Sequence, residues 1–229
     1  MRDEFDPRHP QLLKELNQVY ARRFPPSVAD QKSQIWRRIA AYMQRFVDPA
    51  GAVLDLACDR GDFIRSIRAA EKWATDIREV RSSLPPGVRF VQADGLSLAA
   101  LLPSDHFDAI FMSNYLEHLP SSNAVIQQLE VCYRLLKRGG LVIILQPNIR
   151  LIRERYWDFI DHKVALTDRS LVEATGLAGF ETVQLIKRFL PYTTKNRLPQ
   201  SPALVSFYLR VRPAWLVMGK QTLYVGAKR

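Results

Sequence analysis

The segment Ala-Val-Leu-Asp-Leu-Ala-Cys-Asp-Arg-Gly-Asp, which begins at Ala52, constrains the fold of this chain more than any other part of the sequence. Its apolar first half predicts a buried strand over 52–57, which ends soon after Asp55 and runs into a short polar loop. A helix over 63–70 is expected to follow the loop. A strand, a tight loop and a helix in this order open the α/β units that bind nucleotides.

A second strand, expected over 72–77, places another carboxylate near this loop. Asp76 lies 21 positions after Asp55. That separation is close to the spacing at which such a carboxylate hydrogen-bonds ribose hydroxyls. The sequence therefore predicts a ribose-binding role for Asp76.

The loop departs from the usual pattern of nucleotide loops. These loops use glycine because a Cβ would block the close approach of the backbone to a ligand. Ala57 and Asp59 stand at two of the three glycine positions, and Gly61 fills the third. The charge of Asp59 would oppose a ligand carboxylate if its side chain pointed inward, and it would be harmless if the side chain turned toward solvent, or toward Arg60 or Arg65.

The rest of the chain alternates strands and helices, which predicts a mainly parallel sheet with right-handed crossovers. Further strands are expected over 88–93, 107–113, 140–146, 180–189 and 222–227. Further helices are expected over 122–136, 149–159, 170–175 and 203–211. No internal repeat or low-complexity linker divides the chain. We expect a single globular domain over 49–229, preceded by a helical cap over 1–48.

The predicted cap carries two apolar stripes at helical spacing. The first consists of Leu12, Leu13, Leu16, Val19 and Tyr20, and the second of Ile35, Trp36, Ile39, Ala40, Met43, Phe46 and Val47. The segment is either a cap over a ligand site or a packing element. Its position immediately before the first strand favours the cap.

The net charge of +10 is unevenly distributed. The segment 182–229 holds nine Lys or Arg residues and no Asp or Glu, which leaves 24 basic and 23 acidic residues in the rest of the chain. The same segment contains Phe189, Tyr192, Phe207, Tyr208, Trp215 and Tyr224. A basic, aromatic segment suits an anionic substrate, a membrane surface or nucleic acid. A plain solvated basic face is the other interpretation.

The sequence favours a soluble, cytoplasmic protein. Cys58 and Cys132 fit a reducing compartment better than a disulfide framework. No apolar signal segment is expected at the N-terminus, and no apolar run approaches the length of about 20 residues that spans a bilayer.

Taken in order, these segments resemble the class I S-adenosylmethionine-dependent methyltransferases. The loop segment is similar to the family pattern Val-Leu-Asp-Leu-Gly-Cys-Gly-x-Gly, and Asn114-Tyr-Leu-Glu-His-Leu119 resembles the Leu-Glu-His segment of many small-molecule methyltransferases. The run 135–143 looks like the family's helix, Gly-Gly turn and fifth strand. The resemblance covers residues 50–148. It implies a Rossmann-like α/β fold with a mainly parallel central sheet, an antiparallel last strand and S-adenosylmethionine as the cofactor.

The resemblance also implies a set of cofactor-binding residues. In it, Asp76 binds the ribose, Asp94 contacts the adenine amino group, and Asn114 and Tyr115 line the methionine end or the acceptor pocket. The full set is Asp55, Ala57, Cys58, Asp59, Gly61, Asp76, Ile77, Asp94, Gly95, Asn114 and Tyr115.

His118 is the candidate general base, because its ordinary pKa of about 6.5 lets it take a proton near neutral pH. A structural histidine at the start of a helix is the other interpretation. Trp157, Tyr192 and Lys195 are candidates for the acceptor side. No metal site is expected, because the four histidines, His9, His106, His118 and His162, show no metal-ligand spacing.

These observations predict methyl transfer to a small-molecule or glycan-type acceptor, at oxygen. The basic segment suggests an anionic acceptor, such as a nucleotide-linked or lipid-linked glycan, and peripheral membrane contact through 182–229. Methylation of nucleic acid is disfavoured, because no Asn/Asp-Pro-Pro-Tyr type of segment is present. Two alternatives remain: a non-catalytic binding or scaffold protein that keeps the fold, and an NAD-dependent oxidoreductase, which would need more glycine in the loop.

Overall fold

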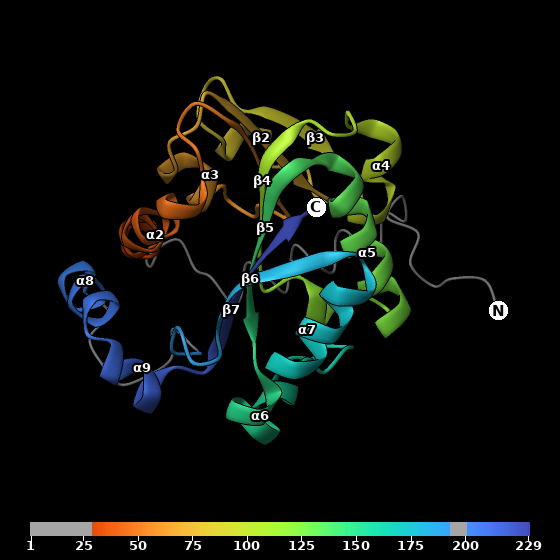
Figure 1. The fold of residues 1–229 in the computed structure, drawn as a ribbon. Helices are drawn as coiled ribbons and strands as arrows, with labels where there is room; N and C mark the ends of the chain where they lie inside the picture. The colour runs from red at the N-terminus through yellow and green to blue at the C-terminus, as the bar shows by residue number, and fades with distance from the viewer. Residues whose placement is uncertain (1–28, 193–200) are drawn as a thin grey trace.

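A seven-stranded sheet forms the centre of the molecule (Figure 1). The computed structural model describes residues 29–192 and 201–229. The strands are β1 (Ala52–Leu56), β2 (Glu71–Asp76), β3 (Arg89–Gln92), β4 (Phe107–Ser113), β5 (Leu136–Pro147), β6 (Phe180–Ile186) and β7 (Gln221–Lys228). Their order is β3-β2-β1-β4-β5-β7-β6. The first five strands pair in parallel, and β7 is antiparallel to both β5 and β6. The predicted mainly parallel sheet with an antiparallel last strand is confirmed.

The strand order changes direction beside β1, which pairs with β2 on one side and β4 on the other. The crossovers to these neighbours leave in opposite directions, and open α/β sheets bind their ligands at the carboxyl ends of the strands at such a point. All five residues of β1 are buried, as expected for a parallel strand covered on both faces. This edge therefore places the loop after β1 where open α/β sheets bind their ligands.

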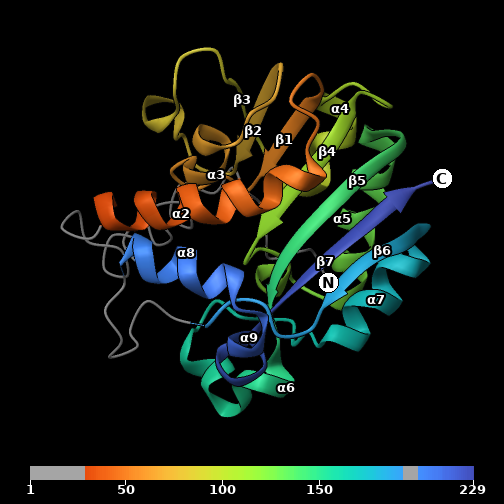
Figure 2. The same cartoon turned by 60° about the vertical axis from the view of Figure 1, so that its left-hand side comes forward.

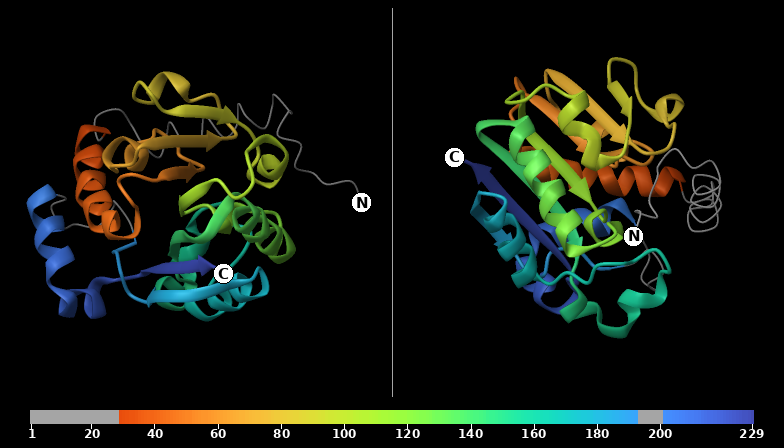
Figure 3. Two further views of the ribbon diagram at one scale, coloured as in Figure 1. Left: turned by 45° about the horizontal axis from the view of Figure 1, so that its top comes forward. Right: turned by 90° about the vertical axis from the view of Figure 1, so that its right-hand side faces the viewer.

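Helices cover both faces of the sheet (Figure 3). One face packs against α2 (Ala29–Met43), α3 (Asp62–Ser66), α8 (Pro202–Arg210) and α9 (Arg212–Met218). The other face packs against α4 (Leu98–Leu101), α5 (Ser122–Leu135) and α7 (Asp168–Leu177). The short helices α6 (Ile149–Ile152), η5 (Leu116–His118) and η6 (Arg153–Asp158) lie in the connections beyond β4 and β5. Each face buries its own hydrophobic cluster.

Helix α2 is the described part of the predicted cap, and it lies beside α3 and α8 (Figure 2). Four members of the second predicted apolar stripe are buried: Ile39, Ala40 and Met43 on α2, and Val47 just after it. The ring of Tyr42 packs against Phe189 and Trp215, with centroid distances of 4.9 Å and 5.9 Å. Helix α2 is therefore joined to the C-terminal part of the chain. The first predicted stripe, from Leu12 to Tyr20, lies outside the described residues.

Several element boundaries differ from the sequence prediction. The helix expected over 63–70 ends at Ser66, and the helix expected over 149–159 is divided into α6 and η6. Strand β5 begins at Leu136 rather than at residue 140, because α5 passes directly into it. The strand expected over 180–189 ends at Ile186. The short helices α4 and α9 were not predicted.

Most of the aromatic residues in the segment 182–229 belong to the core. Phe189, Tyr208, Trp215 and Tyr224 are buried, whereas Phe207 is exposed. Tyr208 donates a hydrogen bond to the Phe189 carbonyl (2.6 Å), and the Trp215 indole donates one to the Tyr208 carbonyl (2.8 Å). The expectation that this aromatic set meets a substrate or a surface is therefore corrected for its four buried members. Within residues 29–192 and 201–229, no helix has the length and hydropathy to cross a bilayer.

Candidate cofactor and acceptor site

The loop after β1 keeps the backbone path of a glycine-rich loop. Ala57, Asp59 and Gly61 all have left-handed backbone conformations, with φ values of 55°, 51° and 72°. Cys58 donates a backbone hydrogen bond to Thr75 of β2 (2.9 Å), which fixes the loop against the neighbouring strand. A left-handed residue other than glycine costs roughly 1–2 kcal/mol and persists where its surroundings hold it. Two of the three positions are thus not glycine, yet all three keep the left-handed backbone conformation.

Asp55 of β1 links the strand before this loop to the helix after it. Its side chain is buried, and Oδ2 accepts a hydrogen bond from the backbone N–H of Ile64 (3.2 Å) at the start of α3. Burial raises the pKa of Asp55 well above its ordinary value. The thiol of Cys58 is also buried, and burial raises its pKa as well. Both groups are enclosed below the loop surface, where they shape the loop.

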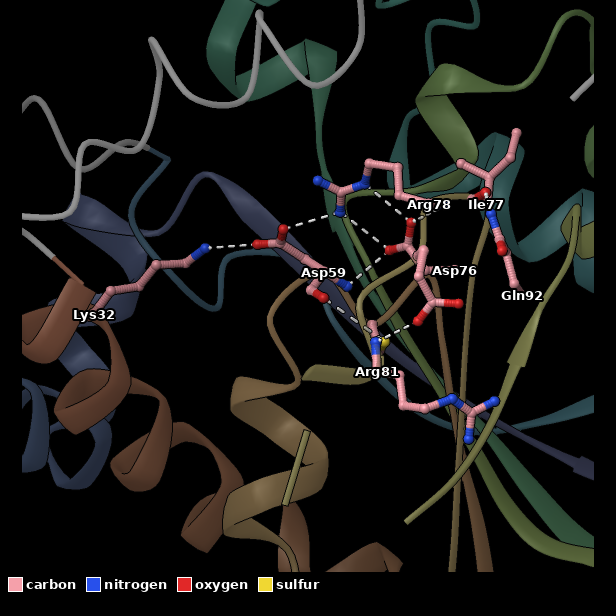
Figure 4. Close-up of polar contacts among 9 residues, drawn as sticks. Lys32, Asp59, Asp76, Ile77, Arg78, Arg81 and Gln92 are labelled. Carbon is pink, nitrogen blue, oxygen red and sulfur yellow. Dashed lines mark hydrogen bonds and ion pairs between the residues drawn. The ribbon is translucent and has the colours of Figure 1, made fainter. Parts of the chain in front are cut away.

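Asp76 ends β2 with its carboxylate directed at the loop (Figure 4). Oδ1 accepts hydrogen bonds from the backbone N–H of Arg78 (2.9 Å) and from Arg78 Nε (3.0 Å). Oδ2 accepts them from the backbone N–H of Asp59 (2.9 Å) and from Arg78 Nη2 (3.1 Å). The side chains of Asp76 and Arg78 are only 5% and 12% exposed, so these bonds are largely shielded from water.

Asp59 takes part in the same network. Its Oδ1 lies 3.0 Å from Arg78 Nη2, and its Oδ2 lies 3.1 Å from Lys32 Nζ of α2. Burial raises the pKa of the Asp59 carboxyl, but the Lys32 ammonium and the Arg78 guanidinium outweigh that effect and hold it below its ordinary value. The partners of Asp59 are therefore not the two arginines considered from the sequence. Arg60 is exposed, and Arg65 instead donates to the Ser83 carbonyl.

The ends of β2 and β3 lie side by side at the edge of the sheet that carries Asp76. Ile77 is half-buried, and its carbonyl accepts a hydrogen bond from Gln92 Nε2 (3.1 Å). Asp94 Oδ1 caps the next turn by accepting from the N–H of Leu96 (3.3 Å). Asp94 can serve a base edge through its other oxygen while it holds this turn.

Gly95 follows Asp94 and is buried. A Cβ at this position would overlap both Tyr115 Oη and Gln128 Oε1. These two atoms are joined by a hydrogen bond of 2.8 Å, and burial raises the pKa of the Tyr115 hydroxyl well above its ordinary value. Gly95 is therefore required by the side chains packed against it.

Asn114 and Tyr115 follow the end of β4 at the same edge of the sheet. Asn114 is exposed and has a left-handed backbone (φ 49°), a conformation that asparagine tolerates better than most residues. Its backbone N–H donates to Leu145 of β5 (2.9 Å). The structure thus brings the predicted residues of β1, β2, β3 and β4 to one edge.

His118 lies in η5, next to the fully buried Glu117. Its Nδ1 is 3.0 Å from the carbonyl oxygen of Asp161, and its Nε2 is 3.9 Å from Glu117 Oε1. Donation from Nδ1 to this carbonyl leaves the lone pair on Nε2, the nitrogen that can take a proton. Burial raises the pKa of Glu117, and the His118 charge opposes that shift. Gln146 Nε2 holds Glu117 Oε2 at 3.0 Å.

Sequence reasoning missed His162 and the packing around it. The rings of His118 and His162 lie 5.1 Å apart, and Phe159 stacks on His162 with a centroid distance of 5.1 Å. Ligand-type atoms of Glu117, His118 and His162 all lie within 4.8 Å of one another. The separation of 44 residues between the two histidines gave no local signal for this grouping.

The three acceptor-side candidates differ in position. Trp157 in η6 is 52% exposed. Tyr192 is half-buried, and its ring lies 6.1 Å from that of Phe159. Lys195 lies outside the described residues. The structure therefore places Tyr192 near the His162 cluster.

Comparison with known proteins identifies the family. A sequence profile described as a methyltransferase domain matches residues 30–185, more than half of the chain. A search of curated protein sequences found no significant match. Among solved structures, a methyltransferase complex with the Trm112 methyltransferase activator from Haloferax volcanii contains a similar chain. That chain has 16% identity and a TM-score of 0.66, with 94% of this chain and 96% of that chain covered.

Two further structures show the same fold. An S-adenosylmethionine-dependent methyltransferase from Archaeoglobus fulgidus has 18% identity and a TM-score of 0.60, with 84% of this chain and 94% of that chain covered. One from Mesorhizobium loti has 18% identity and a TM-score of 0.59, with 82% and 95% covered. The matched profile, the strand order and the loop beside Asp76 agree, and the chain belongs to the class I S-adenosylmethionine-dependent methyltransferases.

Proposed function

We propose that this methyltransferase binds S-adenosylmethionine across the loop 57–61 and Asp76 and methylates an oxygen of a small-molecule, glycan-type acceptor. One observation carries this proposal. A buried carboxylate, Asp76, lies within hydrogen-bond distance of a loop with three left-handed positions, at the edge where the strand order reverses. Ribose-binding sites of open α/β sheets have this arrangement.

The residues fit the cofactor, provided that the Arg78 side chain moves. The loop backbone is shaped for close approach, and the side chain of Asp59 is directed to Lys32 and Arg78. When bound, the cofactor supplies an electrophilic methyl group on its sulfonium. Asp76 would bind the ribose, and Ile77 and Asp94 would border the adenine.

The remaining predicted residues take supporting places in this proposal. Asn114 and Tyr115 would lie at the methionine end, and Asp55, Cys58 and Gly95 would shape the walls. The protein's contribution is mainly positioning of the acceptor oxygen against the methyl group.

His118 is the proposed general base. The Asp161 carbonyl orients the ring, so Nε2 is the atom that receives the proton of an acceptor hydroxyl. Glu117 and Asp161 would then stabilise the imidazolium, since their carboxylate oxygens lie 3.9 Å and 3.4 Å from the ring nitrogens. The half-buried Tyr192 and the exposed Trp157 are the proposed acceptor contacts on this side, and Lys195 is proposed with them.

The proposed acceptor is anionic and nucleotide-linked or lipid-linked. The basic excess of 182–229 supports an anionic acceptor, and α8 and α9 support contact with a membrane. Leu204, Phe207, Leu216 and Val217 on these two helices are exposed. We propose that this α8–α9 surface rests on anionic lipid at the cytoplasmic side, while the catalytic edge meets the acceptor.

Calorimetric titration tests the cofactor site. We expect micromolar binding of S-adenosylmethionine and S-adenosylhomocysteine, and a loss of about 100-fold or more in Asp76→Ala, because both ribose hydroxyls lose a charged acceptor. Glu130→Ala, an exposed carboxylate on α5, is the control and should bind normally. No binding by the wild-type protein up to millimolar cofactor would favour the non-catalytic scaffold.

Chelation tests the assignment of His118 as a base rather than a metal ligand. The proposal requires no metal, so dialysis against EDTA should leave the methylation rate unchanged. A loss of activity that Mg²⁺ or Zn²⁺ restores would assign Glu117, His118 and His162 to a cation instead. In the same assay, the methylation rate of His118→Ala should be about 100-fold or more below that of the wild type, because a general base has been removed.

A further inference from the structure

The hydrogen bonds at Asp76 leave no acceptor position for the ribose in the structure described. An ionised carboxylate has about four lone-pair positions. Asp76 fills two on Oδ1, through Arg78 N and Nε, and two on Oδ2, through Asp59 N and Arg78 Nη2. Two of these four donors are backbone N–H groups, that of Asp59 in the loop and that of Arg78 just after β2. The other two belong to one side chain, that of Arg78.

Removal of that side chain would free one lone pair on each oxygen. Nε binds Oδ1 at 3.0 Å, and Nη2 binds Oδ2 at 3.1 Å. Two adjacent acceptor positions, one on each oxygen, match the two adjacent hydroxyls of a ribose. The Arg78 guanidinium therefore stands where the ribose hydroxyls would donate.

We propose that Arg78 is a resident competitor for the ribose hydroxyls, and that Asp59 retains its guanidinium when the cofactor displaces it. This inference rests on the proposed cofactor site. Arg78 thereby sets the affinity for the cofactor, a role beyond holding the loop.

Asp59 is suited to this retaining role. Its Oδ1 is already 3.0 Å from Arg78 Nη2, the same nitrogen that contacts Asp76 (Figure 4). The guanidinium can therefore give up its bonds to Asp76 while it keeps its contact with Asp59. A glycine at this position would offer no such partner. The retained ion pair offsets the cost of the left-handed backbone at Asp59.

The network also extends to the N-terminal helix. Lys32 of α2 holds the second oxygen of Asp59 at 3.1 Å, so the carboxylate that receives Arg78 is fixed by a residue 27 positions earlier. The Lys32 side chain is 19% exposed and that of Asp59 28%, so this ion pair is partly shielded from solvent. The site that would hold the displaced Arg78 guanidinium therefore consists of Asp59 in the loop, fixed by Lys32 of α2.

Arg78→Met is the first test, since methionine keeps the length and removes the donors. We expect S-adenosylhomocysteine to bind about tenfold more tightly to Arg78→Met than to the wild type, because no charged side chain must leave Asp76. The 2′-deoxy analogue should gain less. A merely structural role of Arg78 would change both affinities alike, which would overturn the proposal.

A double-mutant cycle tests Asp59. Asp59→Asn keeps the size of the side chain but removes its charge, and it should weaken S-adenosylhomocysteine binding about threefold in the wild-type background. In the Arg78→Met background it should have no effect, because there is no guanidinium to retain. Equal effects in both backgrounds would refute the retaining role.

Asp76→Ala separates this inference from the proposed cofactor site. If that variant binds S-adenosylhomocysteine as well as the wild type does, the cofactor site itself is wrong. If it abolishes binding while Arg78→Met matches the wild type for both ligands, the site stands and only the competitor role fails.

Discussion

At the scale of single residues, the loop after β1 keeps the backbone conformation of a glycine-rich loop although two of its three glycine positions hold other residues. Ala57 and Asp59 occupy left-handed positions that glycine adopts without steric cost. Aspartate is among the residues that tolerate this region best. The negative charge of Asp59 is paired with the cationic side chains of Arg78 and Lys32. A substitution that weakens the motif in the sequence therefore leaves the loop geometry in place.

The Asp59 ion pairs should make stability depend on pH in a defined window. Because the pKa of Asp59 is lowered in the folded protein, its contribution is present above the unfolded pKa of about 3.9 and is lost as the pH falls through the folded value. We expect Asp59→Asn to lower the free energy of unfolding by a constant amount above about pH 4. The difference from wild type should vanish at lower pH.

Urea unfolding followed from pH 2.5 to pH 7 measures this difference. The exposed Glu130→Gln on α5 provides the comparison and should follow the wild type throughout. A difference for Asp59→Asn that does not decrease at all as the pH falls would mean that the side chain stabilises the fold by packing, rather than by its charge.

At the scale of elements, strands and helices with a regular apolar pattern could be predicted from the sequence, whereas short helices that form through tertiary packing could not. The buried strands β1, β4 and β5 could be predicted from their apolar runs, and helix α5 could be predicted from the apolar face of the segment 122–136. Helices α4 and α9 are four and seven residues long. Helices this short are stabilised by tertiary contacts, so their own sequences carry little signal.

The same limit applies to the candidate site. Asp55, Asp76 and Asp94 could be placed because each ends or follows a strand, and such residues meet at one edge of a parallel sheet. Lys32 and His162 could not, because Asp59 lies 27 positions after Lys32 and His118 lies 44 positions before His162. Arg78 lies only two positions after Asp76, but its contact with Asp59, 19 positions earlier, depends on how the loop folds. An aspartate at a glycine position does predict a cationic partner, but 33 basic residues offer no way to choose it.

The junction after β3 gives a prediction at this scale. Gly95→Ala should lower the free energy of unfolding by about 1–3 kcal/mol, because its Cβ would overlap Tyr115 Oη and Gln128 Oε1 in a packed interior. Cofactor affinity should fall with it, since Tyr115 must shift. Gly176→Ala in α7 is the matched control.

Apart from its two chain neighbours and the backbone of α7, no described atom would lie within 4 Å of a Cβ at Gly176. Alanine there should be neutral, or stabilising by up to about 1 kcal/mol, because it is the better helix former. Chemical denaturation of both variants measures the contrast. Equal stabilities would show that the Tyr115–Gln128 pair can move aside without cost.

At the scale of the whole molecule, exposed arginines and exposed apolar side chains occur together on α8 and α9. The sheet and its two helix layers bury most large apolar residues, yet Phe207, Leu216 and Val217 are 65%, 70% and 79% exposed. Arg210 and Arg212 lie between them in the chain and are exposed. The α8–α9 surface is joined to α2, whose Lys32 reaches Asp59. A membrane bound at α8 and α9 would therefore lie against the helical layer that borders the proposed cofactor loop.

The membrane proposal predicts binding to anionic vesicles. We expect the protein to cosediment with phosphatidylglycerol vesicles at low salt and much less with phosphatidylcholine, because exposed arginines attract anionic lipid while apolar side chains insert. Replacing Phe207, Leu216 and Val217 together by serine should weaken binding at least tenfold, given about 1.5–3 kcal/mol for burial of one large apolar side chain. Leu177→Ser with Val183→Ser provides the matched control, since these side chains are 66% and 56% exposed on α7 and β6. Equal losses in both variants, or binding that ignores lipid charge and salt, would assign the α8–α9 surface to another partner.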